Sequence, residues 1–118
     1  MIKYKREVLI NYESRDIMAK IKIIEDDLAL AKELKEMLEN AGYSVDITDC
    51  FSNILDQIKE EVPDLILLDI NLPKVNGEVL LQKIRRESNI PIIMVTSKNT
   101  EVDEVLSMSY GADDYITK

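Results

Sequence analysis

Residues that can take part in chemistry follow four short apolar runs of the chain. They are Glu25, Asp26 and Asp27 after residues 21–24, Asp69 after residues 65–68, Thr96 after residues 90–95, and Lys118 close behind residues 115–116. If these runs are parallel strands, their carboxyl ends meet at one edge of the sheet, where functional groups of open α/β sheets gather. The sequence therefore predicts carboxylates, a hydroxyl and an ammonium at one place.

Carboxylates gathered in this way favour a bound cation. Two carboxylates about 4 Å apart repel by about 4 kcal/mol at an effective dielectric constant of about 20, so the cluster must take up protons or bind a cation. Oxygen ligands suit Mg²⁺ or Mn²⁺. Asp69 follows four apolar residues, and a rigid, partly desolvated carboxylate can attack phosphorus and form an acyl phosphate. The Lys118 ammonium and the Thr96 hydroxyl can hold the other phosphoryl oxygens.

The composition excludes several other kinds of site. The 118 residues include no histidine and one cysteine, which rules out a Ser-His-Asp triad, a His-ligated metal, an internal disulfide and a thiolate zinc cluster. The formal net charge of −8 argues against direct nucleic-acid binding. No apolar run reaches the roughly 20 residues that span a bilayer, and no signal-like stretch opens the chain. We therefore expect a cytoplasmic protein without membrane contact.

Strand and helix patterns alternate from residue 20 onward. Short apolar runs predict strands over residues 21–24, 43–48, 65–68, 90–95 and 115–116, with 43–48 at an edge. Apolar residues at three- and four-residue spacing predict helices over residues 28–38, 54–62, 79–84 and 102–109. The alternation predicts an α/β fold, a doubly wound five-stranded parallel sheet.

The helical stripes are expected to face the core, and residues at their ends predict where the helices stop. Gly42 and Pro63 are expected to end the first two helices, and the third starts just after Gly77 with Val79 as its first core residue. Thr100 can cap the fourth helix. The fourth stripe comprises Val102, Val105, Leu106 and Ser109.

Four other α/β classes fit the residues less well. The dinucleotide-binding and phosphate-loop glycine motifs are both absent. A flavin-phosphate loop would carry glycines and hydroxyls after the first strand, where this chain has three acids. A phosphatase of the haloacid-dehalogenase type usually shows Asp-x-Asp at its nucleophile, whereas this chain has Asp69, Ile70 and Asn71.

Several segments together resemble the response-regulator receiver domains (CheY-like). They are residues 23–27, 63–69, 72–73 with Gly77, 94–97 and 111–118. They occur in the family's order and spacing over nearly all of residues 20–118, and the last segment is most similar to the OmpR/PhoB-type transcription regulators. The resemblance implies a flavodoxin-like fold, here without the family's final helix.

The resemblance assigns a role to each acid of the cluster. Asp69 is the expected phospho-acceptor and also a metal ligand. Glu25 and Asp26 are the acid pair that holds Mg²⁺ (or Mn²⁺), and the backbone carbonyl of Asn71 is a further ligand. Asp27 fits the N-terminal acid of the first helix better than a metal ligand.

The resemblance also implies a phosphoryl-binding pair and a switch. Thr96 and Lys118 are expected to bind the phosphoryl group, and Tyr115 is the aromatic switch that turns inward as Thr96 moves. The plainer interpretations are a half-buried aromatic residue at the sheet edge for Tyr115 and a frayed chain end for Lys118.

Residues 1–19 differ from the rest of the chain. They carry a net charge of +1 against −9 for the remainder, so we expect an N-terminal extension followed by a receiver domain over residues 20–118 that ends at the fifth strand. Without the family's fifth helix an apolar sheet face would be uncovered, and residues 1–17 or a second chain are expected to cover it. A homodimer is left open, because Asp103 and Glu104 make the family's usual dimer face unusually acidic.

The sequence thus predicts the receiver domain of a two-component response regulator. It would accept a phosphoryl group from a sensor histidine kinase and switch conformation to control an output, transcription through a DNA-binding domain outside this chain. Its catalysis would be limited to its own phosphorylation and dephosphorylation. Because the chain has no histidine, the phosphohistidine must lie on the kinase. The alternatives are a receiver-fold interaction module that signals without phosphorylation and a metal-dependent phosphatase.

Overall fold

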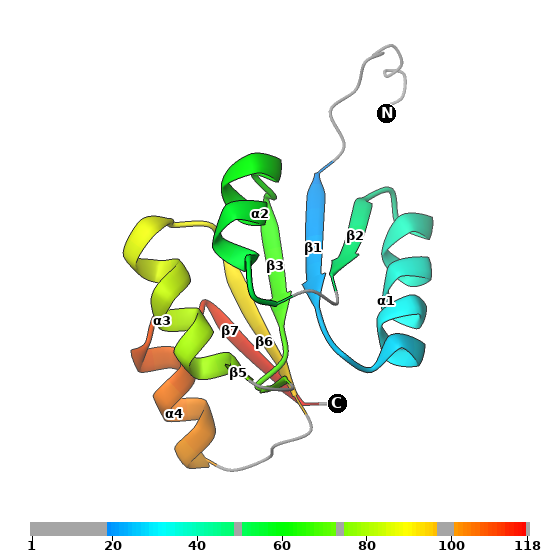
Figure 1. Ribbon diagram of the computed structural model, residues 1–118. Helices are drawn as coiled ribbons and strands as arrows, with labels where there is room; N and C mark the ends of the chain where they lie inside the picture. The colour runs from blue at the N-terminus through cyan, green and yellow to red at the C-terminus, as the bar shows by residue number, and fades with distance from the viewer. Residues whose placement is uncertain (1–18, 49–50, 73–74, 97–100, 118) are drawn as a thin grey trace, which may run out of the picture.

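The computed structural model describes residues 19–48, 51–72, 75–96 and 101–117 (Figure 1). The elements in chain order are β1 (Lys20–Ile24), α1 (Leu28–Asn40), β2 (Ser44–Thr48), α2 (Ile54–Glu61), β3 (Leu65–Leu68), β4 (Asn71–Leu72), β5 (Val75–Asn76), α3 (Gly77–Glu87), β6 (Ile92–Thr96), α4 (Glu101–Ser109) and β7 (Asp114–Thr117). No helix in these ranges has the length and apolar run needed to cross a bilayer.

Five parallel strands form one sheet in the order β2-β1-β3-β6-β7. Ile24 of β1 pairs with Leu68 of β3, which pairs with Met94 of β6, so the three central strands are in level register. The chain runs from β1 out to β2 and then returns past β1 to β3, which places the topological switch point between β1 and β3. The predicted doubly wound five-stranded sheet, with the second strand at an edge, is confirmed.

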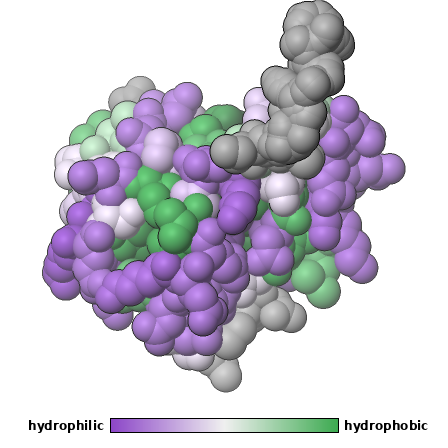
Figure 2. All heavy atoms as spheres, turned by 90° about the horizontal axis from the view of Figure 1, so that it is seen from above, coloured by the Kyte–Doolittle hydropathy of each residue, from purple (hydrophilic) through white to green (hydrophobic). Residues whose placement is uncertain are grey.

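Two apolar clusters cover the two faces of the sheet, and strands β1 and β3 contribute residues to both. Ile23 faces α1, whereas its neighbour Ile24 faces α2 and α3. In Figure 1, α1 stands on one side of the sheet and α2, α3 and α4 on the other. The surface on the side that carries α1 is mostly hydrophilic (Figure 2), as expected for an amphipathic helix with one buried stripe. Both faces are therefore buried where β1 and β3 run, which explains the unbroken apolar sequence of β3 and the three isoleucines of β1.

The first two helices end close to where the sequence predicts. Gly42, which follows α1 and its cap residue Ala41, has a φ of +102°, a conformation that glycine adopts without steric cost. Helix α2 ends at Glu61, and Val62 follows in the left-handed conformation with a φ of 47° directly before Pro63. Since proline disfavours helix at the preceding residue, the stop signal in the sequence is confirmed.

The inward faces of α3 and α4 differ from the predicted stripes. Val79 is 45% exposed and Val105 is 64% exposed, and Ser109 is exposed as well, so these predictions are wrong. Leu106 is partly buried, and Ser107 is fully buried beside Glu78 of α3. The side of α4 that faces inward therefore carries a small polar contact with α3 at Ser107. Thr100 and the Val102 side chain lie outside what the structure describes.

A short hairpin that the sequence did not predict lies between β3 and α3. Strands β4 and β5 pair antiparallel through Asn71 with Asn76 and Leu72 with Val75. Each strand has two residues, too few for any periodicity to be visible. Asn76 then caps α3, because its Oδ1 accepts hydrogen bonds from the backbone N–H groups of Glu78 and Val79.

One arginine ties the end of α3 to the segment between α4 and β7. The Nε of Arg85 donates to the carbonyl oxygen of Gly111 at 2.8 Å, and Nη1 donates to the carbonyl oxygens of Ser88 and Ile90 at 3.2 and 2.7 Å. Its Nη2 lies 2.7 Å from Oδ2 of Asp113. The planar guanidinium thus serves four acceptors from two separate loops.

A buried lysine ties α2 to the first two strands. Lys22 of β1 is 1% exposed, and its Nζ lies 2.9 Å from Asp46 of β2 and 2.8 Å from Glu61 of α2. Desolvation by burial lowers the pKa of Lys22, but the hydrogen bonds to Glu61 and Asp46 outweigh it and raise this pKa above its ordinary 10.5. The charged form of Lys22 is therefore favoured by folding.

We predict that Arg85→Lys lowers the free energy of unfolding by about 2 kcal/mol, because an ammonium keeps the charge but cannot serve four acceptors in a planar fork. Urea denaturation measures the loss. The control is Arg86→Lys at the exposed neighbouring position, where we expect a change within about 0.5 kcal/mol. Equal losses in both variants would show that the fork is unimportant.

The raised pKa of Lys22 predicts a contribution to stability that disappears at high pH. The contribution is fully present below the unfolded-state pKa and is lost as the pH rises through the higher folded-state pKa. Between about pH 9 and about pH 11.5, wild type is expected to lose more unfolding free energy than Lys22→Met in urea titrations. Lys20→Met, at an exposed site of the same strand, should lose as much as wild type. A loss in Lys22→Met as large as that of wild type would contradict this account.

Candidate functional site

Two buried carboxylates lie side by side at the ends of β1 and β3. Glu25 directly follows β1 and Asp69 directly follows β3, and each is 3% exposed. The pairing of Ile24 with Leu68 brings them level, and the backbone N–H of Asp69 donates to the carbonyl oxygen of Ile24 at 3.1 Å. The sheet itself therefore fixes the relative position of these two acids.

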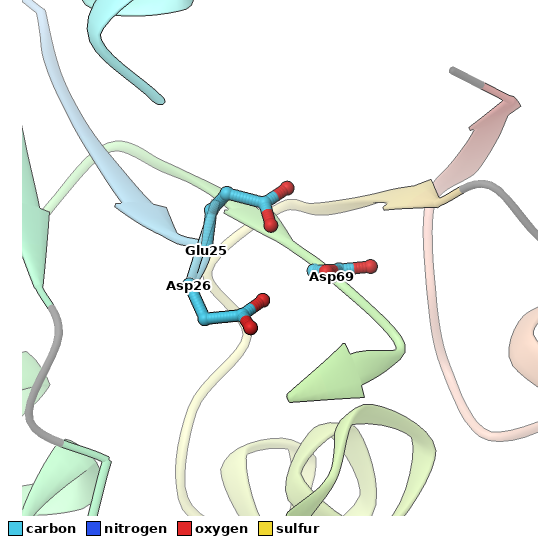
Figure 3. Close-up of side chains that lie close together, drawn as sticks. All are labelled: Glu25, Asp26 and Asp69. Atoms are coloured by element: carbon cyan, nitrogen blue, oxygen red, sulfur yellow. The ribbon is translucent and has the colours of Figure 1, made fainter. Parts of the chain in front are cut away.

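Asp26 completes a cluster of three acids. One carboxylate oxygen from each of Glu25, Asp26 and Asp69 lies within 4.8 Å of the others, and Figure 3 shows the three carboxylate groups lying close together at the strand ends. Asp26 is exposed whereas the other two are buried. Two charges at this separation repel by about 3 kcal/mol at an effective dielectric constant of about 20, so the cluster favours a bound cation.

The donor set fits a small, hard divalent cation. All three side chains offer carboxylate oxygens, which are the ligands that Mg²⁺ and Mn²⁺ prefer. The exposed Asp26 shows that the cluster reaches the protein surface, where water molecules can fill the positions that the protein leaves. Mg²⁺ usually keeps several waters and takes only a few carboxylates, so the arrangement suits it.

Backbone amides orient the two buried carboxylates. The N–H of Asn71 donates to Oδ1 of Asp69 at 3.3 Å, and the N–H of Asp27 donates to Oε2 of Glu25 at 3.1 Å. The side chain of Asp27 has a separate role, because its Oδ1 accepts from the N–H of Leu30 and so caps α1. The expectation that Asp27 is the N-terminal acid of the first helix is confirmed.

Helix α3 begins against the backbone of Asp69. The N–H of Gly77 donates to the carbonyl oxygen of Ile70 at 2.8 Å, and a Cβ atom at Gly77 would overlap the carbonyl oxygen of Asp69. Only glycine allows the helix to start this close to the acid. The sequence shows the spacing of Gly77 but not this reason, which depends on how the hairpin folds back.

The remaining predicted site residues lie on β6 and β7 or beyond them. Thr96 ends β6 and pairs with Thr117 of β7, and its side chain is outside what the structure describes. Tyr115 of β7 is partly buried and packs against the larger apolar cluster. Lys118 lies outside the described residues. The structure thus joins Glu25 and Asp26 to Asp69, while the roles of Thr96, Tyr115 and Lys118 stay predictions.

Known proteins match most of the chain. Residues 21–118 match the family model described as "Response regulator receiver domain". The response regulator protein GraR of Staphylococcus haemolyticus is 41% identical over 96 residues, which are 81% of this chain and 43% of GraR. The sensory transduction protein BceR of Halalkalibacterium halodurans is 42% identical over 101 residues, 86% of this chain and 44% of BceR. The chain thus spans less than half the length of these relatives.

Solved structures are similar to the chain in fold as well as in sequence. The BeF3-activated N-terminal receiver domain of Klebsiella pneumoniae RstA superposes with a TM-score of 0.80 and 33% identity, and the match covers 84% of this chain and 85% of that one. The five-stranded parallel sheet with helices on both sides is therefore that of the CheY-like receivers. From the matched region, the acidic cluster and the fold together, the chain belongs to the response regulator receiver domain family.

Proposed function

We propose that this chain accepts a phosphoryl group on Asp69 from a sensor histidine kinase, with Mg²⁺ held by Glu25, Asp26, Asp69 and the backbone carbonyl of Asn71. The observation that carries the proposal is the approach of three carboxylates within 4.8 Å, one of them the buried Asp69. Mn²⁺ has the same ligand preference and can replace Mg²⁺.

The proposed reaction transfers a phosphoryl group from a nitrogen atom of the donor to a carboxylate oxygen of Asp69. A carboxylate oxygen of Asp69 attacks the phosphorus of the donor, the bond from phosphorus to the donor nitrogen breaks with its electron pair, and an acyl phosphate remains on Asp69. The hydrogen bond from the N–H of Asn71 orients the carboxylate for this attack. A divalent cation at the cluster supplies positive charge that offsets the phosphoryl charge.

Residues on the last two strands complete the proposed site. Thr96 ends β6, next to β3, whose end carries Asp69, and its hydroxyl with the Lys118 ammonium is proposed to bind phosphoryl oxygens. The phosphoryl group adds about −1.5 to −2 of charge, which favours movement of Thr96 toward it and of Tyr115 inward. Both residues lie on paired strands of the same sheet.

The output is proposed to be transcription through a DNA-binding domain outside this chain. The relatives that match are named a response regulator and a sensory transduction protein, and each is more than twice as long as the matched region. Residues 20–118 would form the receiver domain and residues 1–19 an extension. The family resemblance and the acidic net charge of −8 support the proposal that DNA contact is made outside this chain.

Phosphorylation is tested by intact mass after incubation with acetyl phosphate and Mg²⁺. We expect wild type to gain one phosphoryl group and Asp69→Asn to gain none, because the amide is not a nucleophile. Asp56→Asn, at an exposed site on α2, should gain the group as wild type does. If the folded wild type gains nothing, the chain is an interaction module that does not use phosphorylation, and turnover of small phosphate monoesters would indicate a phosphatase.

Metal binding is tested by calorimetric titration with Mn²⁺. We expect Asp26→Asn to weaken affinity by at least about tenfold, because it removes a ligand. Asp27→Asn is the matched control: it removes the same charge one residue away, and asparagine caps a helix as well as aspartate does. Its affinity should change by less than about threefold. Equal weakening in both variants would mean that only the net charge matters.

A further inference from the structure

A buried polar contact joins α3 and α4 outside the acidic cluster. Glu78 is 9% exposed and Ser107 is 0% exposed. The Oγ of Ser107 donates to Oε2 of Glu78 at 3.4 Å, which is long for a hydrogen bond between oxygens. Within the described part of the chain, this is the one hydrogen bond that the structure gives to the Glu78 carboxylate.

This contact holds α4 only weakly. A buried carboxylate with one long hydrogen bond has lost most of its hydration without full replacement. The N-terminal end of α3 offsets part of the cost, since Glu78 lies in the first turn. Movement of α4 away from α3 would return water to the Glu78 carboxylate. A position of α4 farther from α3 is therefore close in free energy to the packed position.

The first turn of α3 is tied to the backbone of Asp69. Gly77 precedes Glu78, and its Cα lies so close to the carbonyl oxygen of Asp69 that no Cβ fits. The N–H of Gly77 also donates to Ile70, the residue after Asp69. A shift of the backbone at Asp69 is therefore passed to Glu78 through one residue.

We propose that Glu78 and Ser107 are positioning residues that couple the state of Asp69 to the packing of α4. Phosphorylation would shift the first turn of α3, break the weak contact and free α4 to move, and with it the exposed side chains of Val105 and Met108. The proposal rests on the proposed function of Asp69. Because a single long hydrogen bond joins Ser107 to the Glu78 carboxylate, a small displacement of the first turn of α3 is enough to break this contact.

Hydrogen exchange of the α4 amides tests the contact in the unmodified chain. Glu78→Gln is expected to slow exchange by about threefold, since a neutral amide is less costly to bury and still accepts from Ser107. Ser107→Ala is expected to speed it by about tenfold, because the carboxylate loses its partner. Ser109→Ala, at an exposed site on the same helix, should leave it unchanged. If Glu78→Gln and Ser107→Ala both speed exchange, the contact is ordinary packing and the proposal is wrong.

The coupling itself is tested by adding Mg²⁺ and beryllofluoride, the activating agent named for the RstA structure. Fluorine NMR reports whether the group binds at Asp69. In wild type we expect binding to speed α4 exchange by about fivefold, and in Glu78→Gln, with binding intact, by less than about twofold. Binding that leaves wild-type α4 unchanged, or that acts equally in both proteins, overturns the coupling. Absence of binding in folded wild type instead overturns the proposed function, and the coupling with it.

Discussion

Mutual repulsion among three carboxylates is the force that the structure around the site must resist. Glu25, Asp26 and Asp69 are held together because adjacent parallel strands end level with one another. The backbone amides of Asp27 and Asn71 each donate to one of the two buried acids, so fixed dipoles replace part of the lost hydration. A cation at this position would bind to a site that folding has already assembled, because the pairing of the strands holds the three charges together.

Helix α3 connects this site to the edge of the sheet that β7 forms. Its first residue, Gly77, lies against the backbone of Asp69, and Arg85 near its other end binds Gly111 and Asp113 beside β7. The helix is therefore fixed at both ends by contacts that do not depend on its apolar stripe. Between these two points Glu78 faces α4 across a much weaker contact. Because the contact between Glu78 and Ser107 is the weakest of the three, we expect α4 to separate from α3 after only a small shift of the first turn of α3.

Much of the fold and the acidic cluster could be predicted from the sequence, because both depend on short-range signals. Unbroken apolar runs mark strands buried on both faces, and acids that follow such runs gather at one sheet edge once the strands are parallel. The inward side of α4 could not be predicted, since a serine gives no burial signal in the sequence and the partner of Ser107, Glu78, lies on another helix. The burial of Lys22 was equally hidden, because its partners Asp46 and Glu61 are distant in sequence.

The bonds of Arg85 join segments that a ribosome synthesises at different times. Gly111 follows Arg85 by 26 residues, and Asp113 both binds this arginine and accepts from the backbone N–H of Ile92 at the start of β6. A ribosome adds residues 111–117 after β6, so β6 is an open sheet edge in the nascent chain until these residues emerge. Open edges pair readily with other strands. In the interval between the emergence of β6 and that of β7, a growing chain thus exposes an edge that can pair with a neighbouring chain.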